Sequence, residues 1–268
     1  MMNPTSRFKI LLLLCAALPS CGPDKQLVEI PFSAKFGDSA LSCASALPAL
    51  RLTDLRFYVS DVFLLRDNGT DVPLEMIRDS AWQNADVALI DLEDGSATCR
   101  NGTAAMNSVL KGRAPAGDYQ GLRFTLGVPE TLNHGDPLIA EAPLTDVAMH
   151  WHWRSGYKFL RAGLEKDGTS YRLHLGSALC HGVIGNLQGC DAGNRAHVVL
   201  EEFNFRDDTV VLDLTSLIAE FQAPVAPTQH CEMGPDEAAC DAFRSALGLD
   251  AAGIAAQPAK LFRAVARQ

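Results

Sequence analysis

The chain has 268 residues, 47% of them hydrophobic, and a mean hydropathy of +0.04, so it can bury the core of one globular domain. Its formal net charge of −9 comes without a basic stripe, which argues against nucleic-acid binding and against electrostatic attachment to an anionic membrane. The motifs GxSxG, HExxH, CxxCH and the P-loop are absent from the sequence, so we expect neither an enzyme of those classes nor a c-type haem on this chain.

The N-terminus predicts export. Arg7 and Lys9 precede an apolar run over residues 10–18, so residues 1–20 are typical of a secretory signal peptide. The end of this segment, LPSCG, resembles a bacterial lipobox, which predicts lipidation of Cys21 and a linker over residues 21–27. Pro19 departs from the small residue usual at its position, so simple cleavage nearby with release into the periplasm is the alternative.

The next part of the chain predicts short β-strands. Apolar and β-branched residues alternate or run together in segments separated by Gly, Asn, Asp and Pro, a pattern typical of antiparallel sandwiches and barrels. The predicted strands are 28–36, 55–65, 86–92, 121–128, 157–164, 170–177, 196–205 and 209–214. Short helices are predicted over 102–112, 214–221 and 235–249, and residues 251–268 as a C-terminal tail. We therefore expect one mainly β domain over residues 28–250, an antiparallel sandwich or barrel-like fold with a few short helices, stapled by disulfides.

Cysteine usage fits an exported protein. Six cysteines remain after Cys15 and Cys21 are set aside, and an even number in an exported chain favours disulfides over a metal site, since no CxxC pair occurs. Closeness in sequence favours the pairs Cys180–Cys190 and Cys231–Cys240, which leaves Cys43–Cys99 for the N-terminal half.

Histidines and tryptophans are concentrated in MHWHWRSGYKF, residues 149–159. On a strand, His150 and His152 would share one face, and two such imidazoles can converge on one metal ion. A solvated strand is the simpler interpretation of this pair.

Three other histidines add weight to a metal site. His134 follows a predicted strand, His174 lies between two leucines, and His181 is next to a cysteine. The alternatives are a turn residue for His134, a histidine packed in the core for His174 and a solvated loop residue for His181. Imidazole ligands suit copper, with zinc as the alternative, so the histidines predict a copper site only if the fold brings them together.

The ordered combination of motifs resembles the MbnP-like family. Cys43 is followed by LRFYVSDVFLL, WQNADVALIDLEDG and CRNGT, and later by YQGLRFTLGVPETLNHGDPL, MHWHWRSGYKF and HLGSALC. The resemblance covers residues 26–250. It implies a mainly β, exported and often lipidated protein, found in the periplasm or at the outer membrane.

The family resemblance also implies a function. Members are commonly paired with a di-haem cytochrome c peroxidase-like partner, MbnH, that oxidises one of their tryptophans to kynurenine. Related surface proteins bind copper through histidines and such a kynurenine, so the resemblance implies one copper ion held by histidines, with kynurenine as a further possible ligand. We therefore expect a copper-handling protein that is the substrate of such a partner and not an enzyme, held to the membrane by its lipid anchor only. The alternative is a lipid-anchored β domain for protein interaction, without metal.

Site residues follow from the matched motifs. His134 in the LNH stretch and His174 in the HLGS stretch are the first ligand candidates, and His152 and His150 are next. The candidates for the oxidised tryptophan are Trp153 and Trp151, before Trp82, although core packing is the ordinary role of a tryptophan.

Overall fold

The computed structural model describes residues 24–267 apart from 46, 48–49, 80, 185, 221–227 and 233–239. The predicted signal peptide and the predicted lipidation site, Cys21, lie outside these residues. Within the described part of the chain, no helix has the length and apolar character needed to cross a membrane.

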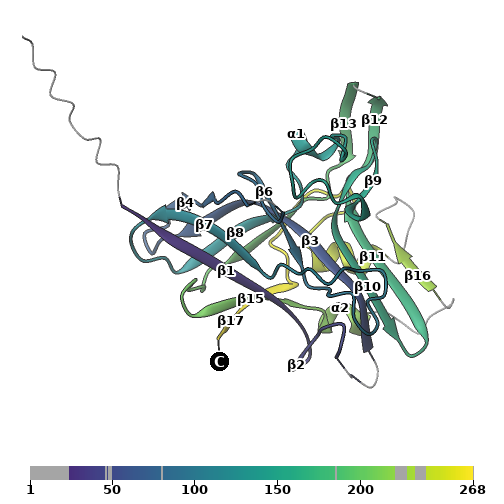
Figure 1. Ribbon diagram of the computed structural model, residues 1–268, viewed down its shortest axis with the longest axis horizontal. Coiled ribbons are helices and arrows are strands. Elements are labelled where there is room, and N and C mark those ends of the chain that lie inside the picture. The colour runs from purple at the N-terminus through teal and green to yellow at the C-terminus, as the bar shows by residue number, and fades with distance from the viewer. Residues whose placement is uncertain are drawn as a thin grey trace, which may run out of the picture.

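The first sheet contains both ends of the described chain (Figure 1). Its strand order is β17 (Phe262–Ala266), β15 (Asp208–Asp213), β1 (Lys25–Phe36), β7 (Val109–Pro115) and β5 (Glu75–Met76), and β2 (Ser39–Ala40) also pairs with β1. Alternate residues of β1 from Val28 to Ala34 are buried, as the period of a strand with one core-facing side requires.

The second sheet is larger and carries the candidate site. Its order is β14 (Ala196–Leu200), β8 (Gly121–Leu126), β3 (Leu50–Leu65), β10 (Gly156–Lys166), β11 (Thr169–Gly176) and β16 (Thr228–Cys231). Shorter strands β4 (Asp71–Pro73) and β6 (Val87–Asp91) pair with β3, and β9 (His150–His152) pairs with β10. A separate ribbon of β12 (Ala178–Val183) and β13 (Asn186–Ala192) projects from the body of the molecule (Figure 1).

Aromatic rings join the two sheets in the core. Phe32 of β1 and Phe262 of β17 each make edge-to-face contacts with Phe57 of β3 and Phe124 of β8, at centroid separations of 5.5–5.9 Å. Such pairs stabilise by about 0.5–1.5 kcal/mol beyond the burial of their surface. The sandwich is therefore closed by side chains from both ends of the sequence.

The mainly β prediction is confirmed, with one difference in strand direction. Most pairs are antiparallel, but β1–β15 and β11–β16 are parallel. In each parallel pair, many residues separate the two strands in the sequence. Alternation of buried and exposed residues predicts a strand but not its direction, so the sequence could not predict these parallel pairs.

The domain limits also differ from those predicted. Residues 262–266, expected in a C-terminal tail, form β17 in the first sheet, and β1 begins at Lys25, within the expected linker.

The helices are short, as expected, but one predicted helix is wrong. Residues 109–115 form β7 and not the end of a helix, because pairing with β1 buries Leu110 in the core. The observed helices are α1 (Glu130–Asn133), η1 (Val147–Met149, a 3-10 turn), α2 (Thr215–Glu220) and α3 (Asp241–Ala246). The last two fall within the predicted ranges 214–221 and 235–249.

The three predicted disulfides are present. Cys43–Cys99 joins the segment before β3 to the loop after β6, and Cys180–Cys190 joins directly opposed residues of β12 and β13. Cys231–Cys240 ties β16 to the start of α3.

Candidate metal centre

Two clefts receive the candidate histidines. His134, His150 and Trp153 line the first, which has a volume of 770 Å³ and which we call the histidine cleft. His174 lines the second, which has a volume of 550 Å³ and which we call the arginine cleft because of its other lining residues. His134 and His174 thus line different clefts, and the expectation that they meet in one site is not met.

The turn after β8 positions His134. Chain leaving β8 forms the single turn α1, and His134 is its C-terminal cap. Its Nδ1 lies 3.2 Å from the backbone oxygen of Trp153, and its Nε2 lies 3.0 Å from Nδ2 of Asn133. This pattern fits a neutral ring that donates from Nδ1 and accepts at Nε2. Burial is the main cause that lowers the pKa of His134, so the neutral form dominates at neutral pH.

Asn133 connects this turn to the histidine-rich hairpin. It is fully buried, its Oδ1 accepts a hydrogen bond from the Tyr157 backbone amide at 3.0 Å, and its Nδ2 donates to Ser177 Oγ at 3.1 Å. Gly156 makes this approach possible, since its φ is +72° and a Cβ there would lie 2.3 Å from the Asn133 backbone oxygen. The NHG and RSGY stretches are therefore one packed unit.

His150 lines the same cleft and has a ring nitrogen without a hydrogen-bond partner among the described residues. Its Nε2 is buried and makes no hydrogen bond to the described residues, and its ring lies edge-to-face on Tyr157 at 4.9 Å. Burial, followed by the positive charge of Lys158, lowers the pKa of His150. Lys158 Nζ donates hydrogen bonds to the backbone oxygens of Ala148 and His150, and these bonds hold the backbone of residues 148–150 in place.

Acidic groups give the histidine cleft a charge suited to a cation. Glu130 and Asp136 both line it. Glu130 Oε1 lies 3.7 Å from His134 Nε2, while its other oxygen pairs with Arg195 at 2.7 Å. Imidazoles and carboxylates are ligand types that divalent transition metals accept. Among the described residues, however, no three of these four side chains, the two histidines and the two carboxylates, hold their ligand atoms within 4.8 Å of one another.

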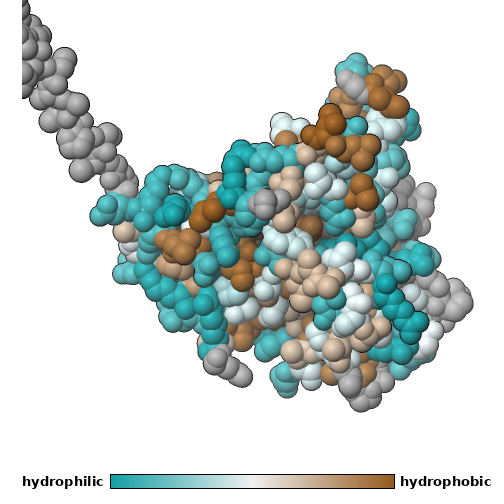
Figure 2. Space-filling model, viewed as in Figure 1, coloured by the Kyte–Doolittle hydropathy of each residue, from teal (hydrophilic) through white to brown (hydrophobic). Residues whose placement is uncertain are grey.

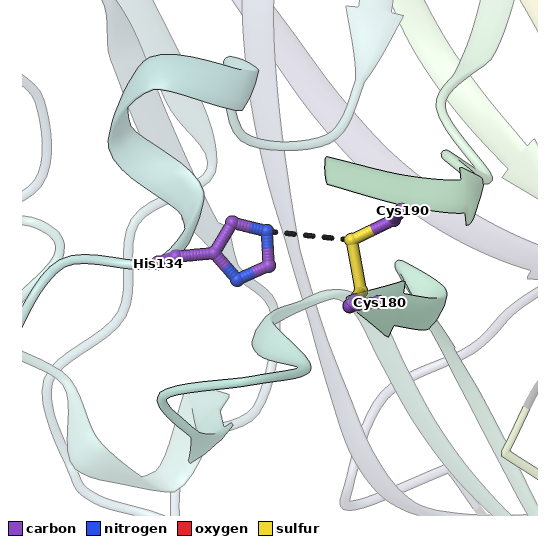
Figure 3. A group of neighbouring side chains, drawn as sticks. All are labelled: His134, Cys180 and Cys190. Carbon is purple, nitrogen blue, oxygen red and sulfur yellow. Dashed lines mark hydrogen bonds between the residues drawn. A yellow bond between two sulfur atoms is a disulfide. The ribbon is translucent and has the colours of Figure 1, made fainter. Parts of the chain in front are cut away.

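His134 also contacts a disulfide (Figure 3). Its Nε2 lies 3.5 Å from Cys190 Sγ, and the three ligand atoms of His134, Cys180 and Cys190 lie within 4.8 Å of one another. The two sulfurs are bonded to each other, so they are not thiolate ligands. The disulfide forms part of the support of the ring.

His152 and His181 lie elsewhere. His152 is exposed, accepts a hydrogen bond from the Arg154 amide at Nδ1 and lies 3.2 Å from Ser155 Oγ. His181 is exposed on the ribbon and pairs with Asp191 at 2.8 Å. The predicted shared face of His150 and His152 is thus divided, with one ring in the cleft and the other in solvent.

His174 lies against Trp151. The two ring centroids are 6.2 Å apart, and the indole packs over Gly176, where a Cβ would lie 2.4 Å from Trp151 Cζ3. Burial, followed by the positive charges of Lys158 and Arg161, lowers the pKa of His174 to about 3. Its Nδ1 lies 3.5 Å from Glu232 Oε1 without forming a hydrogen bond. A positive field of this kind opposes a metal cation at His174.

The three tryptophans differ in setting. Trp153 lines the histidine cleft, with the Arg154 guanidinium 5.1 Å from its ring centre. Trp151 packs on Gly176 of β11. Trp82 packs against the core in a loop where Asp79 accepts a hydrogen bond from the Trp82 backbone amide. Neither tryptophan lines one of the two clefts. Trp153 is therefore the tryptophan that lines the same cleft as His134 and His150.

Sequence reasoning missed several residues of this site. Asn133, Glu130 and Asp136 flank His134 in the sequence, and that proximity was the available signal for them. Lys158 carried no signal, because a strand lysine is ordinarily solvated, whereas here it is 9% exposed.

Exposed apolar side chains of the β12–β13 ribbon form part of the lining of the histidine cleft. Figure 2 shows hydrophobic residues along the projecting β12–β13 ribbon. Val183 and Ile184 of this ribbon line the cleft and are 64% and 74% exposed. Exposed apolar side chains that lie together on a protein surface are typical of interaction sites.

Comparisons with known proteins agree with the fold. The family model MbnP matches residues 25–233. In structure, the chain is similar to MbnP from Methylosinus trichosporium, with a TM-score of 0.81, 26% sequence identity, and coverage of 91% of this chain and 100% of that one. A search of curated proteins finds no match. Since the family model covers most of the chain, this protein belongs to the MbnP family.

Proposed function

We propose that this protein binds one copper ion in the histidine cleft and acts in copper handling outside the cytoplasm. The observation that carries the proposal is the buried, unpartnered Nε2 of His150, in a cleft shared with His134, Trp153 and two carboxylates. Membership of the MbnP family supports it.

His150 and His134 are the proposed ligands. His150 offers its free Nε2, while His134 would give up the contact between its Nε2 and Asn133 in order to bind metal at that atom. Both rings have lowered pKa values, so both stay neutral, as ligation requires, at pH values where an ordinary histidine is protonated. We do not assign ligand roles to His152 and His174, because one is solvated and the other lies in the arginine cleft.

Trp153 is the proposed site of oxidation to kynurenine by a di-haem peroxidase-like partner. The conversion breaks the indole C2–C3 bond, releases C2 as formate, and leaves an aryl ketone at C3 and an aniline. Hydrogen peroxide, the oxidant that a peroxidase-like partner uses, balances the step: one tryptophan and two H2O2 give one kynurenine, one formic acid and one water. Unlike an indole N–H, the aniline nitrogen has a lone pair for a metal. Exposed apolar residues on the ribbon, next to Trp153, offer a surface on which such a partner could dock. In this role the protein is a substrate and not an enzyme.

The same proposal includes a lipid on Cys21 that anchors the protein to the outer membrane, on either its periplasmic side or its outer side. The support is the LPSCG sequence. Replacing Cys21 with Ser should release the protein from the membrane fraction. A Cys21→Ser protein that stays membrane-bound would contradict the anchor.

Metal analysis tests the copper site. Protein loaded with copper and then desalted should retain about one ion, and His150→Ala or His134→Ala should weaken binding by about tenfold or more. His152→Ala and His181→Ala are matched controls that should bind as the wild type does. Loss of copper in His174→Ala with retention in His150→Ala would move the site to the other cleft, and a wild type that retains no copper would reject it.

Intact mass tests the oxidation separately. Co-expression with the partner should raise the mass by about 4 Da, the difference between tryptophan and kynurenine. Trp153→Phe should abolish the increase, whereas Trp82→Phe should not. An unchanged wild-type mass would leave the interaction role, without modification, as the better description of the ribbon surface.

A further inference from the structure

We propose that the arginine cleft binds an oxyanion of the phosphate or sulfate kind, carried on a small organic molecule or on a lipid headgroup. This cleft lies on the outer face of β3, β10 and β11, and the proposal involves neither the histidine cleft nor copper. Arg51, Arg100, Arg161 and Arg172 line it, in a chain whose formal net charge is −9.

The two acidic residues of the cleft are already paired. Glu165 binds Arg51 at 2.6 Å. Asp54 binds Arg161 at 3.0 Å and also accepts two hydrogen bonds from the buried Arg56. One carboxylate is thus shared by two guanidinium groups, so the cleft keeps an excess of positive charge.

Arg100 and Arg172 are the two cations left for a ligand. Both are exposed, and neither has an ion pair with any of the described residues. The guanidinium group carries donors in a planar fork that matches two oxygens of a phosphate or sulfate, and it stays charged at any physiological pH.

Gly163 and two hydroxyl side chains lie among these arginines. Gly163 of β10 stands opposite both Asp54 of β3 and Arg172 of β11 in the sheet register, so it adds no side chain of its own to the cleft. A Cβ at Gly163 would lie 2.3 Å from Thr53 Oγ1, so the Thr53 hydroxyl lies over this glycine. Thr53 and Ser170 therefore line the cleft with hydroxyls that can act as neutral donors.

The wall that carries Arg100 is fixed in place. Cys99 is bonded to Cys43, and Thr98 Oγ1 donates to the backbone oxygens of Cys43 and Leu52. A preorganised wall lowers the entropy cost of holding a ligand. The volume of 550 Å³ is within the range of small-molecule sites and large for a bare inorganic ion, which favours an anionic group on a larger molecule.

The depressed pKa of His174 reports the same excess charge. After burial, its causes are the positive charges of Lys158, Arg161 and Arg172. An anion seated beside Arg172 would relieve this repulsion.

Calorimetric titration of the full mature chain tests the proposal, with inorganic phosphate, pyrophosphate and glycerol 3-phosphate as probes at constant ionic strength. We expect saturable binding that is weakened about tenfold or more in Arg100→Gln and in Arg172→Gln. Arg113→Gln on β7, an exposed arginine of the other sheet, removes the same charge and should bind as the wild type does. Equal binding in all three variants, or no binding beyond that of chloride, would overturn the proposal.

Vesicles distinguish the two sources of the anion. The Cys21→Ser chain is sedimented with phosphatidylglycerol or phosphatidylcholine vesicles. Retention by phosphatidylglycerol alone, lost in Arg172→Gln and competed by glycerol 3-phosphate, assigns the cleft to a lipid headgroup. Binding of the soluble probes without vesicle retention assigns it to a free organic phosphate. Vesicle retention that is the same in Arg172→Gln and Arg113→Gln would count against the cleft.

Discussion

The Asn133 side chain accepts a hydrogen bond from the Tyr157 backbone amide, and this bond joins the turn that carries His134 to the hairpin that carries His150. Asn133→Ala leaves that buried amide without its partner and removes the bond that Asn133 Nδ2 donates to Ser177 Oγ, whose own bond to the Gly193 backbone oxygen remains. We expect a loss of about 1–3 kcal/mol in the free energy of unfolding, measured by urea denaturation. Asn68→Ala, which removes a similar bond in an exposed turn, should cost less than about 0.5 kcal/mol. Equal losses in both variants would show that Asn133 does not join the two segments.

Gly156 should be less tolerant of a side chain than Gly168. Both have positive φ, +72° and +80°, but a Cβ at Gly156 would overlap the Asn133 backbone, whereas at Gly168 it would meet nothing within 4 Å. Gly168→Ala should cost only the conformational strain, about 1–2 kcal/mol. Gly156→Ala should cost clearly more in the same urea titration and should weaken copper binding, because the two histidine segments would separate. Equal costs would contradict the close approach.

Acid should destabilise the metal-free protein through His174. Its pKa is about 3 in the folded chain and 6.5 in an ordinary setting, so between these values the unfolded state binds a proton that the folded state does not. The contribution of His174 is therefore complete above pH 6.5 and is lost as the pH falls toward 3. His174→Gln should flatten the fall of the melting temperature between pH 7 and 4.5. The exposed His197→Gln is the control, and a wild-type slope in both variants would contradict this account.

Asp91 should act in the opposite direction. Burial raises its pKa from 3.8 to about 7, so the folded state keeps a proton that the unfolded state has released in this range, and stability falls as the pH rises through 7. Asp91→Asn keeps an oxygen for the Glu93 amide and removes the charge. We expect a gain of about 1–3 kcal/mol in unfolding free energy at pH 8 and a smaller gain at pH 5, which lies closer to the unfolded pKa of 3.8. Asp94→Asn, in an exposed turn, should show no such difference between the two pH values; a pH-independent effect of Asp91→Asn would refute the assignment.

The sequence predicts the strands well because residue alternation directly records which side faces the core. β1 and β8 follow the expected ranges closely. The disulfide pairs were predictable from spacing, since few partners lie near each cysteine. Strand direction was not, because β1 meets β15 only through a long-range parallel pairing.

The candidate site was only partly predictable. Period-two reasoning assigns His150 and His152 to one face, but β9 has three residues, and a register shift between Gly156 and Tyr157 interrupts the pairing. The His150 ring packs on Tyr157 and lines a cleft together with His134, and no local sequence pattern encodes that arrangement. The arginine cleft was missed for the same reason, since Arg51, Arg100, Arg161 and Arg172 come from four separate segments.

The position of β1 has a consequence for how the molecule is assembled. β1 lies between β7 and β15, and β15 in turn pairs with β17. The sheet that begins with the first strand of the chain is therefore complete only after the last strands have formed. Contacts of such large sequence separation slow folding. A chain shortened before residue 208 exposes an open strand edge, which other unfinished chains can join. Nearly the whole polypeptide must therefore be available before this sheet is complete and its strand edges are covered.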